Sequence, residues 1–147
     1  MPKSAELLTS QSGLIRVSPI RILLADDNDA VLAEVREELG AEFEIIGTVT
    51  NGLDAVEAVR LFNPDVLVMD IAMPVLDGIA ASERICKIDG RPKILFLTIQ
   101  ESAEYVTAAF AAGASGYVTK RRLLNDLAHA IREVTEGRTF LSPSLHR

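Results

Sequence analysis

Acidic side chains stand at two points of the sequence where an apolar run ends. Asp26 and Asp27 follow the run 20–25, and Asp70 follows the run 66–69. Carboxylates that lie within a few ångströms of one another raise each other's pKa, so a cluster of them needs a cation to neutralise it. Mg²⁺ is a hard ion that proteins hold with one or two carboxylates, waters and a phosphate. These residues therefore indicate a Mg²⁺ site if the fold brings them together.

A hydroxyl and an ammonium group stand at the ends of two further apolar runs. Thr98 ends the run 93–98, and Lys120 follows the short run 116–119. An ammonium group pairs well with phosphoryl oxygens. Catalysis of phosphoryl transfer consists chiefly of positioning the reactants and neutralising charge. Carboxylates, a hydroxyl and a cation at one edge of a sheet would suit that chemistry.

Short apolar runs alternate with longer segments of helical period, which is typical of strands alternating with helices. We expect strands at 20–25, 43–49, 66–69, 93–98 and 116–119, and helices at 31–39, 51–62, 79–88, 102–112 and 123–134. This order predicts an α/β fold, a doubly wound, five-stranded parallel sheet with helices on both faces. Ligands bind such sheets beyond the carboxyl ends of the strands. The chemically capable residues are therefore expected to converge in one crevice.

The length and composition are those of one globular domain. The chain has 147 residues, of which 48% are hydrophobic and 24% charged, enough to bury a sizeable core. Residues 1–18 show no sustained period and are expected to form a flexible tail. Residues 19–137 are expected to form the domain, and residues 138–147 a linker-like tail.

Composition also excludes several classes of protein. A net charge of -6 argues against unaided binding to nucleic acid. The apolar stretches are too short to cross a membrane. The N-terminus shows no secretory signal, and the lone Cys86 cannot form an internal disulfide, so we expect a cytoplasmic protein.

Four segments resemble the receiver domains of bacterial two-component response regulators. They are Asp26-Asp27, residues 66–78, Leu97-Thr98 and residues 113–120, and they carry the family's active-site residue types in the correct order. The resemblance covers roughly residues 20–137 and implies a flavodoxin-like, CheY-like fold. Residues 137–143 and the Gly-Tyr-Val-Thr-Lys form of the last segment are similar to the subfamily whose receivers precede a LuxR-type helix-turn-helix domain.

The resemblance implies roles for the acidic residues. Asp70 would accept a phosphoryl group and become an acyl phosphate. Asp27 would bind Mg²⁺ directly, and Asp26 would bind it directly or through water. The backbone carbonyl of Ala72 would be a further ligand, next to Asp70 itself.

The resemblance also implies a switch. Lys120 would pair with the phosphoryl group, and the Thr98 hydroxyl would move toward it. Tyr117 matches the family's aromatic switch position, and its ring would turn inward as Thr98 shifts. Ile99 stands where relatives often carry alanine, and its branched side chain could narrow access to Asp70.

Several residues also have simpler interpretations. Arg121 and Arg122 are more simply a solvated basic turn at the start of a helix. Tyr117 could be only a half-buried strand aromatic, and Cys86 is more simply a packed helix residue. The acidic pair at 26–27 could cap the following helix, although the other active-site types make this reading weaker.

The family pattern implies a phosphoacceptor switch rather than an enzyme. Its partner would be a sensor histidine kinase or a phosphotransferase, its output would be transcriptional, and it could form a homodimer. DNA would be contacted only through a helix-turn-helix domain that this sequence does not contain. Two alternatives remain: an interaction module that works without phosphorylation, and a haloacid-dehalogenase-type phosphatase, which would need a second Asp where Ala72 stands.

Overall fold

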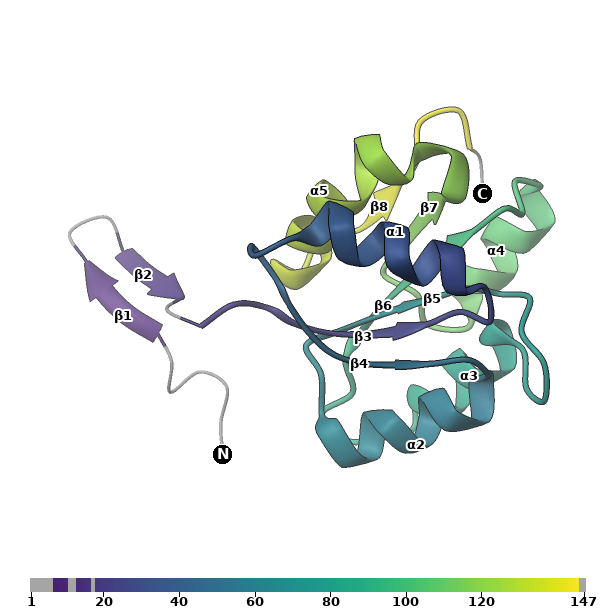
Figure 1. Cartoon of the computed structure of the whole chain (residues 1–147), viewed down its shortest axis with the longest axis horizontal. Helices are drawn as coiled ribbons and strands as arrows, with labels where there is room; N and C mark the ends of the chain where they lie inside the picture. Colours follow the sequence, from purple (N-terminus) through teal and green to yellow (C-terminus); the bar gives the residue numbers. More distant parts are fainter. Residues whose placement is uncertain (1–6, 11–12, 17, 146–147) are drawn as a thin grey trace.

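The computed structural model of the chain describes residues 7–10, 13–16 and 18–145. The body is a parallel sheet of six strands in the order β4-β3-β5-β6-β7-β8 (Figure 1). The strands are β3 (Arg21–Ala25), β4 (Glu44–Val49), β5 (Val66–Met69), β6 (Lys93–Thr98), β7 (Gly116–Thr119) and β8 (Phe140–Leu141). The helices of the described part are α1 (Asp29–Leu39), α2 (Gly52–Phe62), α3 (Gly78–Ile85), α4 (Ala103–Ala111) and α5 (Leu123–Thr135).

The strand order reverses beside β3. The chain first adds β4 on one side of β3 and then crosses over to place β5 on the other side. The doubly wound fold is therefore confirmed. Open sheets of this kind leave a crevice at the reversal point, beyond the carboxyl ends of the strands, and here that point lies between β3 and β5.

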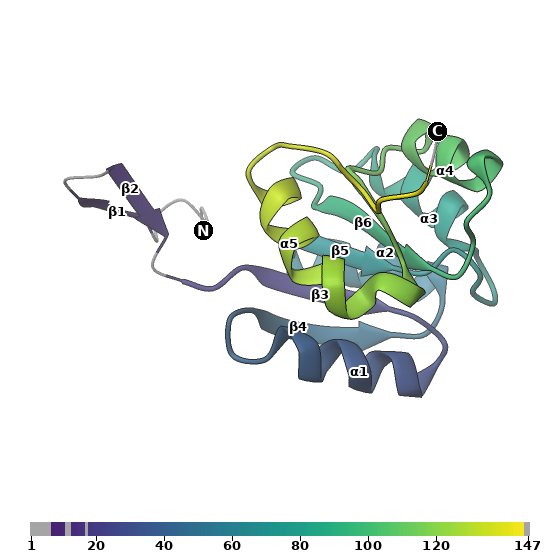
Figure 2. The ribbon, with the colours of Figure 1, turned by 90° about the horizontal axis from the view of Figure 1, so that it is seen from above.

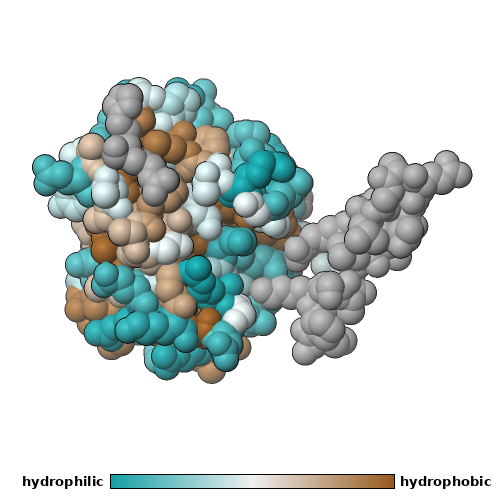
Figure 3. Space-filling model, turned by 180° about the vertical axis from the view of Figure 1, so that it is seen from behind, coloured by the Kyte–Doolittle hydropathy of each residue, from teal (hydrophilic) through white to brown (hydrophobic). Residues whose placement is uncertain are grey.

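Helices cover both faces of the sheet, with α1 and α5 on one side and α2, α3 and α4 on the other (Figures 1 and 2). Alternate residues of β3 point to opposite layers: Leu23 belongs to the core under α2–α4, and Ile22 and Leu24 belong to the core under α1 and α5. All four residues of β5 are buried, as a strand covered on both faces requires. On the face seen in Figure 3, hydrophilic and hydrophobic residues are interspersed.

Side-chain caps fix where the helices begin. Asn51 caps α2, because its side chain accepts a hydrogen bond from the Asp54 backbone N–H at 2.8 Å. Asn28 caps α1 in the same way, and Asp77 caps α3. Asn28 begins α1 within a few residues of the end of β3, whereas Asp77 begins α3 only after the loop 70–77 that follows β5. None of the helices in the described ranges combines the length and the apolar character needed to span a membrane.

The C-terminal residues differ from the expected linker. Residues 140–141 form β8, which pairs in parallel with β7 and adds a sixth strand to the expected five. Beyond it, Leu145 is buried in the core. A strand of two residues is too short to show a period of its own, so the pattern along the sequence could not reveal it.

The N-terminal residues contain a short hairpin within the expected tail. Strands β1 (Leu7–Ser10) and β2 (Gly13–Arg16) pair antiparallel. The remaining parts of that segment, residues 1–6, 11–12 and 17, lie outside the described residues. The flexibility of the segment stays a prediction.

The loop after β5 folds tightly back onto the strand end, and Gly78 makes this approach possible. A Cβ atom at Gly78 would lie 2.1 Å from the backbone oxygen of Asp70. We therefore expect Gly78→Ala to lower the free energy of unfolding by about 1–3 kcal/mol, since the backbone next to Asp70 must shift. Urea titration measures this change. Gly47→Ala is the matched control, because its Cβ would meet Leu23 Cδ1 at an ordinary 3.6 Å; equal losses in both variants would contradict the prediction.

Candidate functional site

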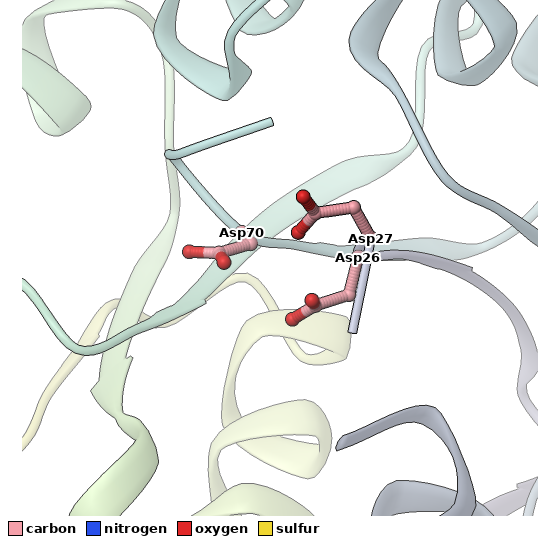
Figure 4. Close-up of side chains that lie close together, drawn as sticks. All are labelled: Asp26, Asp27 and Asp70. Carbon is pink, nitrogen blue, oxygen red and sulfur yellow. The ribbon is translucent and has the colours of Figure 1, made fainter. Parts of the chain in front are cut away.

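Three carboxylates meet at the reversal point of the sheet. Ala25 and Met69 are register partners in β3 and β5, so the residues that follow them, Asp26 and Asp70, emerge side by side. One ligand oxygen from each of Asp26, Asp27 and Asp70 lies within 4.8 Å of the others. Figure 4 shows the side chains of Asp26 and Asp27 extending toward the side of Asp70. The predicted convergence of the acidic residues is therefore present in the structure.

The three carboxylates differ in their access to solvent. Asp26 is 3% exposed and Asp70 is 5% exposed, whereas Asp27 is an exposed residue. Backbone N–H groups hold the two buried ones: Asn28 donates to Asp26 Oδ1 at 2.9 Å, and Ile71 donates to Asp70 Oδ1 at 2.7 Å. The remaining oxygen, Oδ2, of each buried carboxylate is turned to a common cation.

That cation is Lys120, which lies in a 3₁₀ turn (Lys120–Arg122) directly after β7. Its Nζ is 2.9 Å from Asp26 Oδ2 and 3.0 Å from Asp70 Oδ2. Burial opposes the charged form of the lysine, but hydrogen bonds to both carboxylates outweigh it and raise the pKa of Lys120. The ammonium group therefore stays charged at neutral pH and neutralises part of the acidic cluster.

Asp26 carries a net cost of ionisation. Burial raises the pKa of Asp26 above its ordinary value, although the hydrogen bond with Lys120 lowers it in part. A carboxyl whose folded pKa is raised binds more protons in the folded state than in the unfolded state, so its ionisation destabilises the fold at higher pH. The cost is present above the folded pKa and disappears as the pH falls through it.

We expect Asp26→Asn to raise the free energy of unfolding at pH 7 in buffer free of divalent cations. The gain should shrink as the pH falls through the raised folded pKa of Asp26, because wild type then sheds the same charge. Urea titrations across a pH series measure this. A gain that stayed constant with pH would contradict the assignment, and Asp29→Asn, at an exposed first-turn position, is the control.

Thr98 ends β6, Tyr117 lies within the neighbouring β7, and both residues are fully buried. The Tyr117 hydroxyl donates to the backbone carbonyl of Gln100 at 2.7 Å, and the Gln100 N–H approaches Thr98 Oγ1 at 3.4 Å. Burial, together with the nearby charge of Asp70, raises the pKa of Tyr117, so its hydroxyl remains a donor. The resemblance implied that the Tyr117 ring turns inward when Thr98 shifts. In the structure the Tyr117 ring is already buried, although Lys120 pairs with Asp70.

Three further residues singled out in the sequence take different positions. Ala72 lies in the loop after β5 and is exposed; its role as a carbonyl ligand stays a prediction. Ile99 is 69% exposed. Cys86 is half-buried against the core, with its Sγ 3.2 Å from the carbonyl of Ala112, which confirms packing as its structural role.

One polar network near the site escaped the sequence analysis. Arg122, expected to be solvated, forms a two-pronged ion pair with the buried carboxylate of Asp126, with distances of 2.8 Å and 3.0 Å. Ser142 donates to the same carboxylate at 2.8 Å. The i, i+4 spacing of Arg122 and Asp126 was the only available signal, and it is common on solvated helix faces.

The donor set fits a hard divalent cation. Carboxylate oxygens from three aspartates converge, and the exposed position of Asp27 leaves the cluster open to solvent on one side. Oxygen donors with an open side suit Mg²⁺, which keeps several waters. Lys120 neutralises only part of the charge, so the remaining acidic excess favours such an ion.

Comparisons with known proteins agree with this geometry. The family described as the response regulator receiver domain matches residues 22–132. The chain is 38% identical over 114 residues to the chemotaxis protein CheY of Halobacterium salinarum, covering 78% of this chain and 95% of that protein. It is 32% identical to the transcriptional regulatory protein DegU of Brevibacillus brevis over 133 residues, 89% of this chain and 56% of the relative.

A solved structure supports the same relationship. The crystal structure of a LuxR-family two-component response regulator from Aurantimonas sp. SI85-9A1 is 34% identical, with a TM-score of 0.81, and the match covers 86% of this chain and 91% of that one. The isolated receiver domain of RcsB from Salmonella enterica serovar Typhimurium, solved in the presence of phosphomimetic BeF3⁻, shares the fold at 23% identity and a TM-score of 0.78, covering 86% and 96%. The chain spans 56–64% of the length of three transcriptional or response-regulator relatives that it matches.

Proposed function

Because the chain belongs to the response regulator receiver domain family, we propose that it is a Mg²⁺-dependent phosphoacceptor switch modified on Asp70. One observation carries the proposal: Lys120 Nζ bridges the buried carboxylates of Asp26 and Asp70 at 2.9 Å and 3.0 Å. With the neighbouring Asp27, this arrangement holds a nucleophile, a cation and two further acids at one point of the sheet edge.

The chemical step uses Asp70 as the nucleophile. A carboxylate oxygen of Asp70 forms a bond to phosphorus while the bond from phosphorus to the donor nitrogen or oxygen breaks, and the electron pair leaves with the donor. The Lys120 ammonium group would pair with the negatively charged oxygens of the transferred group. Asp26, Asp27, Asp70 and the Ala72 carbonyl would hold Mg²⁺, which when bound neutralises charge on the phosphoryl oxygens.

The proposed partner is a sensor histidine kinase or a phosphotransferase that presents a phosphorylated side chain. The modification replaces the singly charged carboxylate of Asp70 by an acyl phosphate that carries roughly two negative charges, and it places strong acceptor oxygens next to Thr98. Because Thr98 and Tyr117 are both tied to the backbone of Gln100, a movement of Thr98 would alter the loop after β6. We propose that this change is the signal, that it can alter homodimer formation, and that the output is transcriptional in a longer protein.

An alternative use of the fold is binding without phosphorylation, favoured by the exposed hydrophobic side chain of Ile99 at the rim. The two functions differ in one respect. A partner of the second kind would bind wild type and Asp70→Asn with equal affinity, whether or not a phosphoryl donor is present.

Intact-mass measurement tests the leading proposal. Wild-type protein incubated with acetyl phosphate and Mg²⁺ should gain the mass of one phosphoryl group. Removing Mg²⁺ with a chelator should abolish the gain. No gain in mass with acetyl phosphate, phosphoramidate or a histidine kinase would reject the proposal.

A further inference from the structure

The C-terminal segment lies along the strand that leads to the active-site lysine. Strand β8 pairs with β7 so that Phe140 is opposite Gly116 and Leu141 is opposite Tyr117. The backbone N–H of Ser142 donates to the carbonyl of Tyr117 at 3.0 Å. The segment therefore contacts β7 along most of its length. We call residues 140–145 the C-terminal latch.

Apolar side chains anchor the latch on both faces of the sheet. The ring of Phe140 meets that of His129 edge-on, with centroids 5.7 Å apart, and it packs against the core under α1 and α5. Leu141 and Leu145 pack on the opposite core, the one that contains Tyr117. The latch is thus held by the same two layers that hold β7.

A buried hydroxyl joins the latch to the end of β7. Ser142 is 1% exposed, and its Oγ donates to Asp126 Oδ2 at 2.8 Å and accepts from the Thr119 N–H at 3.3 Å. Burial alone would raise the pKa of Asp126, but hydrogen bonds from Arg122 and Ser142 lower it, so the carboxylate is charged. Ser142 therefore links the latch, α5 and the strand end through one oxygen.

Thr119 is the point where this network reaches the active site. It immediately precedes Lys120, whose ammonium group is held between Asp26 and Asp70. The Thr119 hydroxyl is buried, and among the residues that the structure describes it has no hydrogen-bond partner. An unsatisfied buried hydroxyl costs free energy, so the position that the end of β7 takes in the structure is not fully favourable. A second position that satisfied this hydroxyl could lie close to it in free energy.

We propose that phosphorylation of Asp70 loosens the C-terminal latch; this inference rests on the phosphoacceptor function proposed above. A phosphoryl group on Asp70 draws the Lys120 ammonium toward its oxygens and away from the carboxylates. Thr119 directly precedes Lys120 in the chain, so a shift of the Lys120 backbone displaces Thr119 as well, and the Thr119 N–H moves away from Ser142 Oγ. The hydrogen bonds between the latch and β7 weaken, so the conformation of residues 140–145 depends on whether Asp70 is phosphorylated.

Coupling of this kind is reciprocal. If phosphorylation weakens the latch by a given factor, then a weakened latch strengthens binding of a phosphoryl group or its analogue by the same factor. Ser142 is then a positioning residue, since it acts on Lys120 through Thr119. Its removal should increase the affinity of the site for a phosphoryl analogue, which a merely structural serine would not do.

Amide hydrogen exchange measured by NMR on the full chain tests the proposal. The probe is beryllofluoride with Mg²⁺, and the reporters are the backbone amides of Phe140 and Ser142, which donate to Ser115 and Tyr117. In wild type the probe should speed exchange of both amides by about fivefold or more. Ser142→Ala should show faster exchange without the probe and bind the probe about fivefold or more tightly. Ser144→Ala, at an exposed neighbouring serine, should behave as wild type.

A ligand-free comparison separates this inference from the proposed function. Lys120→Gln should speed exchange at Phe140 and Ser142, whereas Lys87→Gln, at an exposed helix-end position, should not. If beryllofluoride does not bind at all, the phosphoacceptor function fails, and the Lys120→Gln result alone decides whether the latch senses the lysine. If beryllofluoride binds but exchange at both amides and the affinity of Ser142→Ala are unchanged, the latch proposal is overturned and the phosphoacceptor function stands.

Discussion

Asp70→Asn is expected to acquire no phosphoryl group under conditions that fully modify wild type. An amide has no anionic oxygen to attack phosphorus, so the loss should be complete rather than partial. The fold should survive, because the amide oxygen can still accept the Ile71 N–H that now donates to Asp70 Oδ1 at 2.7 Å. Intact mass after incubation with acetyl phosphate and Mg²⁺ measures the result.

The matched control for Asp70→Asn is Asp77→Asn. Asp77 is an exposed acid in the same loop, and its side chain caps α3 through the Ala80 N–H, a role that asparagine fills equally well. This variant should be modified like wild type. A mass gain in Asp70→Asn equal to that of Asp77→Asn would place the acceptor on another side chain.

Asp70→Asn also changes the charge of the acidic cluster. With one of the three clustered carboxylates neutral, Mg²⁺ loses an anionic ligand and should bind more weakly. In Mg²⁺-free buffer Lys120 would then neutralise Asp26 alone, so Asp70→Asn should be at least as stable as wild type. A urea titration with and without Mg²⁺ should show a smaller stabilisation by the ion in the variant.

The acidic cluster could be predicted because its position follows from periodicity. Apolar runs mark β3 and β5, and any residue placed directly after two adjacent parallel strands must emerge at one edge of the sheet. The positions of Asp26 and Asp70 could therefore be predicted without knowledge of side-chain conformation. The helix start at Asn51 was predictable for a similar reason, because a cap depends on residues three apart in sequence.

The C-terminal latch could not be predicted, because its partners are distant in sequence and its strand is short. Ser142 meets Asp126 across 16 residues and Thr119 across 23, and no local pattern encodes such contacts. The position of the Tyr117 ring is a similar case. Whether a strand aromatic points in or out depends on the space beside it, and here the backbone carbonyl of Gln100 receives its hydroxyl inside the protein.

Lys120→Met is expected to be the most destabilising single change at the site. Methionine keeps an unbranched, flexible side chain but removes the charge that now lies 2.9 Å and 3.0 Å from two buried carboxylates. Removing one partner of a buried ion pair leaves uncompensated charge and costs about 3–5 kcal/mol. We expect a loss of about 3 kcal/mol in the free energy of unfolding at pH 7 without divalent cations, near the lower end of that range because Asp27 keeps the cluster open to solvent.

Two treatments should restore the stability of Lys120→Met. Saturating Mg²⁺ should restore most of it by supplying the missing positive charge. Lower pH should also restore it. Without the ammonium group the raised folded-state pKa of Asp26 rises further, the folded state then binds more protons than the unfolded state, and stability increases as the pH falls through that value.

Urea titrations at pH 7 with and without Mg²⁺ measure the effect of Lys120→Met, and Lys93→Met, at an exposed position in β6, is the control. Adding Asp26→Asn to Lys120→Met should recover part of the loss, since the two residues interact directly. Were Lys120→Met as stable as Lys93→Met in the absence of Mg²⁺, the ammonium group would not be what neutralises the acidic cluster. The proposed pairing of Lys120 with the phosphoryl group would then lose its electrostatic basis.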